Sequence, residues 1–316
     1  MKLIKFACHT TIDMLYKLIF GSQLELIYLD SDPTFADWRI FISWPTRVSC
    51  PESVVGAYDA IILDDLRAVN LFKRSGIKAC HKIYHNHGFY GNSNERHQMR
   101  AEFNQCPAVF ADGTLLRDAA TWMDIGPYCL SGKAVPDERF AFSNERNGRA
   151  MTIRTELIGR INMYPGKERA HETLSLAYKK LAHRYDIYGY NHSEVPIVYR
   201  RGYNPSVAET RYYSVHLVPE TTPICHYALL ETMALGVYPV FVSARDDLPV
   251  EEEGYSYSII KDPGEAVQMV WSLMQDHDLS VKSGIRTQEM ARRRFSFVSF
   301  ADIICGFVEG VVGGRL

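Results

Sequence analysis

Residues 60–84 read AIILDDLRAVNLFKRSGIKACHKIY, and this stretch contains one complete β-α-β unit. Residues 60–63 and 82–84 are short apolar runs, which are typical of buried strands. Between them, residues 66–75 place apolar side chains three and four positions apart, as a helix that covers a sheet does. Parallel strands need a crossover of this kind, so the stretch predicts a parallel sheet with helices packed on it.

The same alternation extends over the first half of the chain and predicts a doubly wound α/β domain. Its other strands are expected at residues 3–8, 24–29, 109–111 and 128–130, and its other helices at 12–20, 94–104 and 115–123. A second series of the same kind has predicted strands at 156–158, 186–188, 214–218 and 238–242, and predicted helices at 168–181, 224–234, 265–274 and 281–293. Between the two series, the polar and aperiodic stretch SNERNGR at 143–149 favours a linker.

The chain length supports two domains, because 316 residues exceed one ordinary hydrophobic core. The predicted fold class is therefore α/β, with two Rossmann-like, doubly wound domains that face a central cleft. We expect an N-terminal domain on the acceptor side over residues 1–145 and a nucleotide-sugar-binding domain over residues 146–295. A C-terminal helix is expected over residues 296–316, and packing against the N-terminal domain is one option for it.

Composition excludes several classes of protein. A content of 47% hydrophobic and 23% charged residues is that of a globular chain rather than a disordered one. The formal net charge of −2 gives no overall field that would attract nucleic acid. Lys5 and Asp13 interrupt the start of the chain where a signal peptide is apolar, and no uncharged apolar stretch reaches the ~18 residues of a membrane span. We therefore expect a cytoplasmic protein without a membrane span.

One loop of the second domain has the composition of a diphosphate site. In open parallel sheets, ligands bind at the carboxyl ends of the strands, so loops after strands are the places to search. Residues 159–169, GRINMYPGKER, follow a predicted strand and open a helix. Glycine lets the backbone approach phosphate oxygens, and the cations supply charge-assisted hydrogen bonds. We expect diphosphate contacts from Gly159, Arg160, Lys167 and Arg169.

A later helix of the same domain contains an acidic residue among apolar ones. Residues 221–240 read TTPICHYALLETMALGVYPV, in which Thr222 is a suitable N-cap and Gly236 a suitable helix end. Glu231 lies among leucine, methionine and alanine, and a carboxylate in such surroundings usually has a specific partner. Thr222 and Glu231 are therefore candidates for nucleotide-sugar binding, with a solvent-facing helix position as the competing interpretation of Glu231.

The first domain places the histidine loop, His85-Asn86-His87-Gly88, directly after a predicted strand. Either histidine could relay a proton from an acceptor hydroxyl or bind sugar hydroxyls, and the glycine allows a sharp turn. We therefore take His85, Asn86 and His87 as the candidate catalytic residues. A structural role for the two histidines is the competing interpretation.

The motifs of the second domain resemble, in content and order, the nucleotide-binding domain of glycosyltransferase family 4 and related GT-B enzymes. They are IGR with GKER, YDIYGYN, ETRYYSVHLVPE, ALLETMALGVYPVF and RRRFSFVSF. The resemblance implies that Arg160 and Lys167 hold the diphosphate and that Glu231 holds the ribose hydroxyls. It also implies a nucleotide-sugar co-substrate, a UDP-sugar, with no permanently bound cofactor and no essential metal. The family usually has a second, earlier glutamate, and Pro223 occupies that position here.

The histidine loop is similar to that of the DNA glucosyltransferases of T-even bacteriophages, which modify hydroxymethylcytosine. Their catalytic His-Asp pair corresponds to His85 and Asn86 here, and the resemblance extends to the motifs LIGR, YGYN and GVYPVF. This resemblance implies double-stranded DNA that carries hydroxymethylcytosine as the acceptor, in the cytoplasm of a phage host.

The sequence as a whole predicts a hexosyl- or pentosyltransferase that moves a sugar from a UDP-sugar to a hydroxyl acceptor. Three alternatives stay open: a family 4-like transferase acting on a glycan, lipid or small molecule; a GT-B-shaped binding protein without catalysis, which Pro223 favours; and a nucleotide-sugar epimerase. Asp30-Ser31-Asp32 matches the metal-binding motif of GT-A enzymes, but we interpret it as a turn after a strand. The sugar, the anomeric outcome and the oligomeric state are left open.

Overall fold

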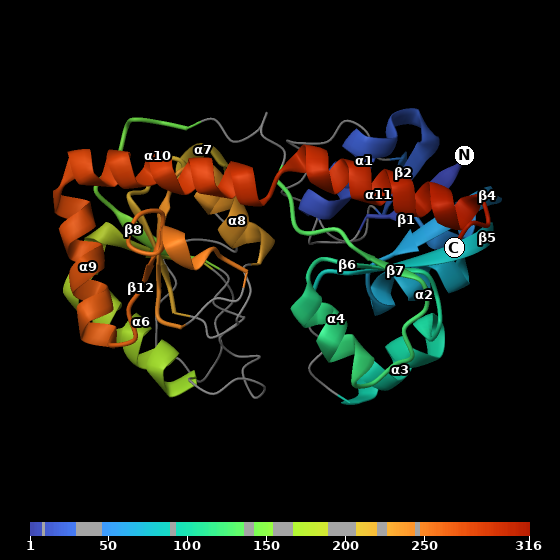
Figure 1. Ribbon diagram of the computed structural model, residues 1–316, viewed down its shortest axis with the longest axis horizontal. Helices are drawn as coiled ribbons and strands as arrows, with labels where there is room; N and C mark the ends of the chain where they lie inside the picture. Colours follow the sequence, from blue (N-terminus) through green and yellow to red (C-terminus); the bar gives the residue numbers. More distant parts are fainter. Residues whose placement is uncertain are drawn as a thin grey trace. The chain divides into compact units, whose positions relative to one another are not determined.

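In a computed structural model, the chain divides into two compact units (Figure 1). Unit 1 comprises residues 1–134 and 297–316, and unit 2 comprises residues 135–296. The boundary at 134/135 precedes the expected one at 145/146, and the C-terminal helix is part of unit 1. The structure describes residues 1–7, 10–29, 46–88, 93–135, 142–153, 167–188, 207–219, 226–243 and 247–316.

The described strands of unit 1 form one parallel sheet in the order β3-β2-β1-β4-β5-β6-β7. The chain runs outward from β1 to β3 and then returns to β4 on the other side of β1. Strands β1 and β4 therefore flank the topological switch point, where open α/β sheets bind ligands. The strands are β1 (Leu3–Phe6), β2 (Leu24–Leu29), β3 (Thr46–Val48), β4 (Val55–Leu63), β5 (Gly76–Asn86), β6 (Ala108–Phe110) and β7 (Tyr128–Leu130).

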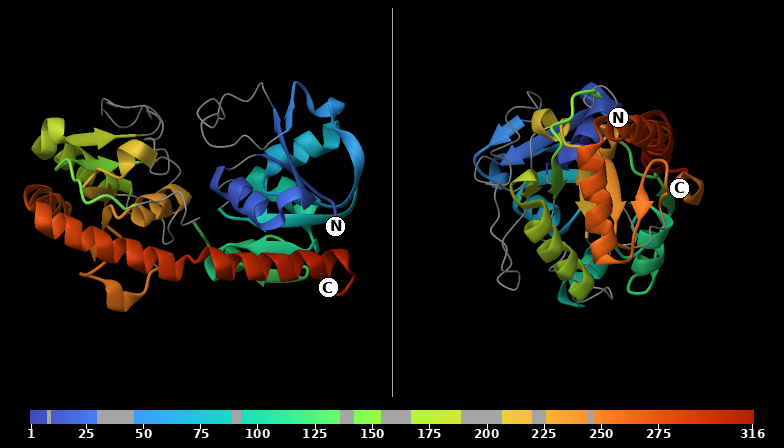
Figure 2. Two further views of the ribbon diagram at one scale, coloured as in Figure 1. Left: turned by 90° about the horizontal axis from the view of Figure 1, so that it is seen from above. Right: turned by 90° about the vertical axis from the view of Figure 1, so that its left-hand side faces the viewer.

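Helices cover both faces of this sheet, as a doubly wound domain requires. The helices are α1 (Thr10–Phe20), α2 (Leu66–Arg74), α3 (Ser93–Phe103), α4 (Gly113–Ala120) and α11 (Phe297–Val312). Helix α11 packs against α1, β5 and β7, whereas α2 packs against α3, β1 and β5. Figures 1 and 2 show α1 and α11 lying side by side on one face of the sheet. The doubly wound first domain is therefore confirmed.

Helix α11 is unusually apolar. Among the described residues, the stretch 277–312, in which residues 295 and 296 separate two helices, contains a window that is long and apolar enough to cross a membrane. Core helices meet the same criterion, and α11 buries Phe300, Ile304 and Val308 within unit 1. This packing explains the apolar composition of the helix.

Unit 2 contains a second parallel sheet, whose described strands have the order β12-β11-β10-β8-β9. The strands are β8 (Ala150–Thr152), β9 (Tyr185–Ile187), β10 (Val215–Val218), β11 (Tyr238–Phe241) and β12 (Ser258–Ile259), and the helices are α6 (Lys167–Leu181), α7 (Val207–Thr210), α8 (Tyr227–Ala234), α9 (Pro263–Gln275) and α10 (His277–Arg294). The predicted strand at 156–158 lies outside the described residues, and β8 is an additional strand ahead of it.

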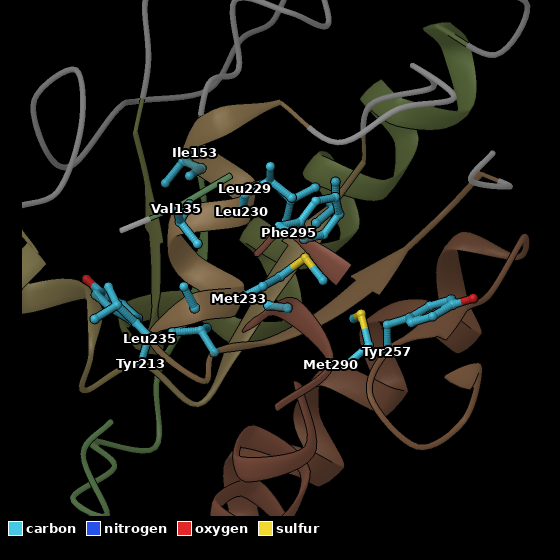
Figure 3. Packing of buried hydrophobic residues seen from close by; sticks show 14 of the residues in the cluster. Val135, Ile153, Tyr213, Leu229, Leu230, Met233, Leu235, Tyr257, Met290 and Phe295 are labelled. Carbon is cyan, nitrogen blue, oxygen red and sulfur yellow. The ribbon is translucent and has the colours of Figure 1, made fainter. Parts of the chain in front are cut away.

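Two apolar clusters sandwich the second sheet. The first contains buried side chains of α6 and α9, and the second contains buried side chains of α8 and α10 (Figure 3). Adjacent strand residues such as Ala150 and Met151 belong to opposite clusters, because successive side chains of a strand point to opposite faces. A parallel sheet that is buried on both faces explains why its strands are continuous apolar runs.

Arg146 connects the predicted linker to the rest of unit 2 by hydrogen bonds. Its guanidinium donates hydrogen bonds to the carbonyl oxygens of Arg211 (2.7 Å), Tyr213 (3.1 Å) and Gly236 (2.8 Å). Burial lowers the pKa of this guanidinium to about 10. Residues 143–149 are thus an integral part of unit 2 rather than a free linker, and their polar composition reflects these backbone contacts.

Candidate functional site

Polar side chains converge at the carboxyl edge of the unit 1 sheet, beside the switch point. Asp64 follows β4, Lys5 lies in β1, and the histidine loop begins with the last two residues of β5. The register pairs Lys5 with Ile62 and Leu63 with Tyr84. Because alternate residues of a strand share a face, this register places Lys5, Asp64 and His85 on the same face of three neighbouring strands.

Lys5, Asp13 and Asp64 form a buried ion triad. The Lys5 ammonium lies 2.8 Å from Asp13 Oδ1 and also contacts the Asp64 carboxylate, and all three side chains are fully buried. Asp13 lies in the first turn of α1, where the helix dipole favours a carboxylate. Two carboxylates therefore share one ammonium in the interior of unit 1.

His85 is a core residue of unit 1. Its ring is fully buried, with its centroid 5.4 Å from that of Tyr16 and 5.9 Å from that of His87. Within the described part of the chain, neither ring nitrogen of His85 has a hydrogen-bond partner. Burial lowers the pKa of His85 well below its ordinary value, and the charges of His87 and Lys5 lower it further. His85 is therefore a neutral imidazole at neutral pH.

Asn86 and His87 differ in their exposure to solvent. Asn86 is buried, and its Oδ1 accepts a hydrogen bond from the backbone N–H of Gly88 (3.2 Å), which shapes the turn after β5. His87 is partly exposed. Burial lowers the pKa of His87. The charges of Asp64 and Asp65 oppose this effect, whereas the charge of Lys5 adds to it. Within the histidine loop, His87 is thus the imidazole that is not fully buried.

A second ion pair lies further along the same edge. Asp112 follows β6 and caps α4, since its Oδ1 accepts from the backbone N–H groups of Thr114 (2.8 Å) and Leu115 (3.0 Å). Its other oxygen lies 3.4 Å from the Lys133 ammonium, which is almost fully buried after β7. The carboxyl edge of the first sheet is therefore lined by charged and titratable groups from β4 to β7.

The burial of His85 predicts a pH dependence of stability. Because folding lowers the pKa of His85, its neutral form contributes stability that is fully present above the unfolded pKa and is lost as the pH falls towards the folded pKa. We expect the free energy of unfolding to fall below about pH 6.5 with a slope of up to ~1.4 kcal/mol per pH unit from this residue. In the His85→Gln variant, which cannot titrate there, that part of the slope should disappear.

Urea unfolding between about pH 5 and about pH 7.5 measures this slope. His277→Gln is the matched control, because the side chain of His277 is 58% exposed and its removal should leave the slope unchanged. An equal slope in the parent and in His85→Gln would show that His85 takes up its proton as readily in the folded state as in the unfolded state.

The predicted nucleotide-binding residues belong to unit 2, and the structure describes some of them. Lys167 begins α6, and Arg169 is exposed in its first turn. Glu231 is partly exposed on α8, where Ala228 shares this side and the other residues of the helix are buried. Gly159, Arg160 and Thr222 lie outside the described residues. The nucleotide-binding roles of these six predicted residues stay predictions.

The start of α8 differs from the expectation. The helix begins at Tyr227 rather than at residue 224, and its N-cap is His226, whose Nδ1 accepts from the backbone N–H of Leu229 (3.1 Å). Thr222 is therefore not the cap of this helix. The imidazole acts here as the hydrogen-bond acceptor that serine, threonine or aspartate usually provides.

A metal site is not formed by the described part of the chain. Within it, no group of three or more His, Cys, Asp or Glu side chains could hold a metal ion. Asp30 and Asp32 lie outside the described residues. The absence of an essential metal stays a prediction.

The sequence interpretation missed Lys5 and Asp13 as members of the site. Lys5 interrupts the apolar strand LIKF, and Asp13 interrupts the apolar start of α1. A charge within an apolar element is the signal that could have found them, because a buried charge needs a partner.

Comparison with known proteins gives matches only at the level of structure. No family model and no curated protein matches the chain. HepE from Anabaena, solved in complex with UDP-glucose, matches with 10% identity and a TM-score of 0.67 over 98% of this chain and 100% of that chain. Sucrose-phosphate synthase from Thermosynechococcus elongatus matches with 9% identity and a TM-score of 0.64 over 99% and 100% of the two chains.

A glycosyltransferase from Rickettsia africae matches with 11% identity and a TM-score of 0.57 over 98% of both chains. Sequence identities of this size establish a common fold, but they do not establish a common activity or substrate. The likeness extends over both units in each of these three proteins. The chain therefore has the α/β fold of GT-B glycosyltransferases, as its sequence predicts.

Proposed function

We propose that the protein is a glycosyltransferase that transfers a sugar from a UDP-sugar to a hydroxyl group of an acceptor. The most direct support is the structural match, over nearly the whole of both chains, to a protein solved with UDP-glucose. The titratable groups at the carboxyl edge of the unit 1 sheet add support, because this edge is where open α/β sheets bind ligands. The sugar is a hexose or a pentose in this proposal.

Unit 2 supplies the donor side in this proposal. Arg160 and Lys167 bind the diphosphate, with Gly159 and Arg169 beside them in the same stretch. Glu231 accepts hydrogen bonds from the ribose hydroxyls, for which its partly exposed position on α8 is suited. Thr222 lies in the stretch that precedes α8 and contacts the nucleotide sugar.

Unit 1 supplies the acceptor side. His87 accepts a proton from the acceptor hydroxyl or binds it, because it is the partly exposed imidazole of the loop. His85 and Asn86 support the loop from within the core. Hydroxymethylcytosine in double-stranded DNA is the acceptor that the resemblance of the loop suggests, and a cytoplasmic location goes with it.

Binding of UDP tests the donor side. We expect Lys167→Ala and Arg160→Ala each to weaken UDP binding by ~1.5–3 kcal/mol, because each removes a charge-assisted contact to phosphate. Lys179→Ala is the matched control, since Lys179 is an exposed lysine in the last turn of the same helix α6. Titration calorimetry with UDP gives the three affinities. Parental affinity in both site variants would remove the phosphate assignment.

Turnover tests the reaction class. A panel of UDP-sugars is incubated with and without acceptors, including hydroxymethylated DNA, a glycan and a lipid, and UDP release is followed beside mass spectrometry of the acceptor. A transferase releases UDP with a sugar-bearing acceptor. An epimerase turns over without acceptor, and a binding protein binds UDP without turnover, so either result would contradict the proposal.

A further inference from the structure

A pocket of about 260 Å³, here called the α10 pocket, lies in unit 2 between α10 and the stretch that precedes β12. Glu252, Tyr255 and Ser256 line it from that stretch, and four residues of α10 between 286 and 293 complete the lining. Because β12 runs parallel to β11, its amino end lies at the edge of the sheet opposite to the carboxyl edge. The α10 pocket is therefore separate from the edge at which open α/β sheets bind nucleotides.

The charged groups of the α10 pocket balance one another. Two arginines and two glutamates line it, so its formal net charge is zero. The Arg293 guanidinium pairs with the Glu252 carboxylate, and Ser256 Oγ donates a hydrogen bond to the same carboxylate (2.6 Å). Arg286 and Glu289 complete the charged lining, and both are exposed. The α10 pocket thus offers a ligand both hydrogen-bond donors and hydrogen-bond acceptors.

Apolar surface accompanies these charges. Tyr255 is 58% exposed, and the Arg286 guanidinium lies 5.5 Å from the centroid of its ring. Met290 is the buried member of the lining and belongs to the second apolar cluster (Figure 3). A ligand of the α10 pocket can therefore place C–H groups against an aromatic ring while its polar groups contact the charged side chains.

We propose that the α10 pocket binds one residue of a neutral saccharide. Each sugar hydroxyl both donates and accepts a hydrogen bond, so a sugar requires guanidinium donors and carboxylate acceptors side by side. An ionic ligand would meet like charges as well as opposite ones, and like charges in contact are costly. The nucleotide sugar is assigned to other parts of unit 2, so the inference goes beyond the proposed function and does not rest on it.

Methyl NMR of the methionines reports on the α10 pocket directly, because Met290 lines it. A Met290→Leu spectrum assigns the signal. The titrants are glucose, galactose, N-acetylglucosamine and xylose, together with anionic glucuronate and protonated glucosamine. We expect at least one neutral sugar to shift the Met290 signal with a dissociation constant of ~1–10 mM, since one shallow pocket offers few contacts. The two charged sugars should bind more weakly than that neutral sugar.

Two variants with matched controls locate the binding. Tyr255→Ala should weaken it by ~10-fold, whereas Tyr128→Ala, which removes a tyrosine of similar exposure (51%) from unit 1, should not change it. Arg286→Ala should weaken it by ~10-fold as well, whereas Lys282→Ala, which removes an exposed cation one turn earlier on α10, should not. All four side chains are exposed, so the variants should fold, and thermal melts verify this.

Three results would overturn the inference. The first is a Met290 signal that no neutral sugar shifts, and the second is unchanged sugar binding in Tyr255→Ala. The third is a preference for glucuronate or glucosamine, because the α10 pocket would then select charge. Saturating UDP should leave the sugar affinity unchanged, and competition by UDP would place the sugar at the donor site instead. None of these failures touches the proposed function, which UDP calorimetry and turnover test separately.

Discussion

Replacement of His87 by alanine is expected to lower kcat for sugar transfer by ~10²-fold or more, with unchanged affinity for UDP. Removal of a general acid–base group usually has an effect of this size. His87 is the partly exposed histidine of a loop at the carboxyl edge of the first sheet, so its loss should affect the reaction more than the fold. Initial rates with saturating donor, together with UDP calorimetry, measure the two quantities.

His97→Ala is the matched control for this experiment, because His97 is an exposed histidine of the same unit, on α3. It should transfer sugar at the parental rate. Thermal melts must accompany the kinetics. Parental turnover in His87→Ala, or loss of activity through unfolding alone, would remove His87 from the reaction.

Replacement of Lys5 by methionine is expected to lower the free energy of unfolding by ~3–5 kcal/mol. The substitution keeps the volume of the side chain but leaves the carboxylates of Asp13 and Asp64 close together in the interior without their ammonium. Breaking a buried ion pair on one side usually costs this much, because an uncompensated charge stays buried. Urea unfolding at neutral pH measures the change.

Two comparisons define the origin of this loss. Lys73→Met removes an exposed lysine from its pair with the partly buried Glu102, which keeps Lys82 as a second partner, and pairs near the surface contribute only ~0–1 kcal/mol. The triple variant Lys5→Met/Asp13→Asn/Asp64→Asn removes all three charges and should recover most of the lost stability. If Lys5→Met proves as stable as Lys73→Met, the triad is not an important part of the fold.

The sequence predicts a strand well where an apolar run has clearly polar flanks. The run at 24–29 agrees with β2 at both ends, whereas β4 and β5 begin several residues before the predicted runs at 60–63 and 82–84, because their first halves also contain exposed residues. Strands β3, β8 and β12 have two or three residues and show no periodicity of their own. Their pairing with neighbouring strands defines them, and a single sequence does not contain that information.

The candidate site also has a part that the sequence predicts and a part that it does not. The histidine loop is visible in the sequence because its residues are adjacent and follow an apolar strand. The contact between Lys5 and Asp64 joins residues 59 positions apart, and only the pairing of β1 with β4 brings them together. Spatial convergence of this kind follows from sheet order, which a single sequence does not contain.

The chain passes between the two units twice, once after residue 134 and once after residue 296. During synthesis on the ribosome, domains generally fold as they emerge, starting from the N-terminus. Unit 1 cannot do so completely, because α11, which covers α1, β5 and β7, is translated only after the whole of unit 2. A nascent chain that has reached residue 296 therefore exposes an apolar face of its first unit, and this intermediate is the one that a chaperone would recognise.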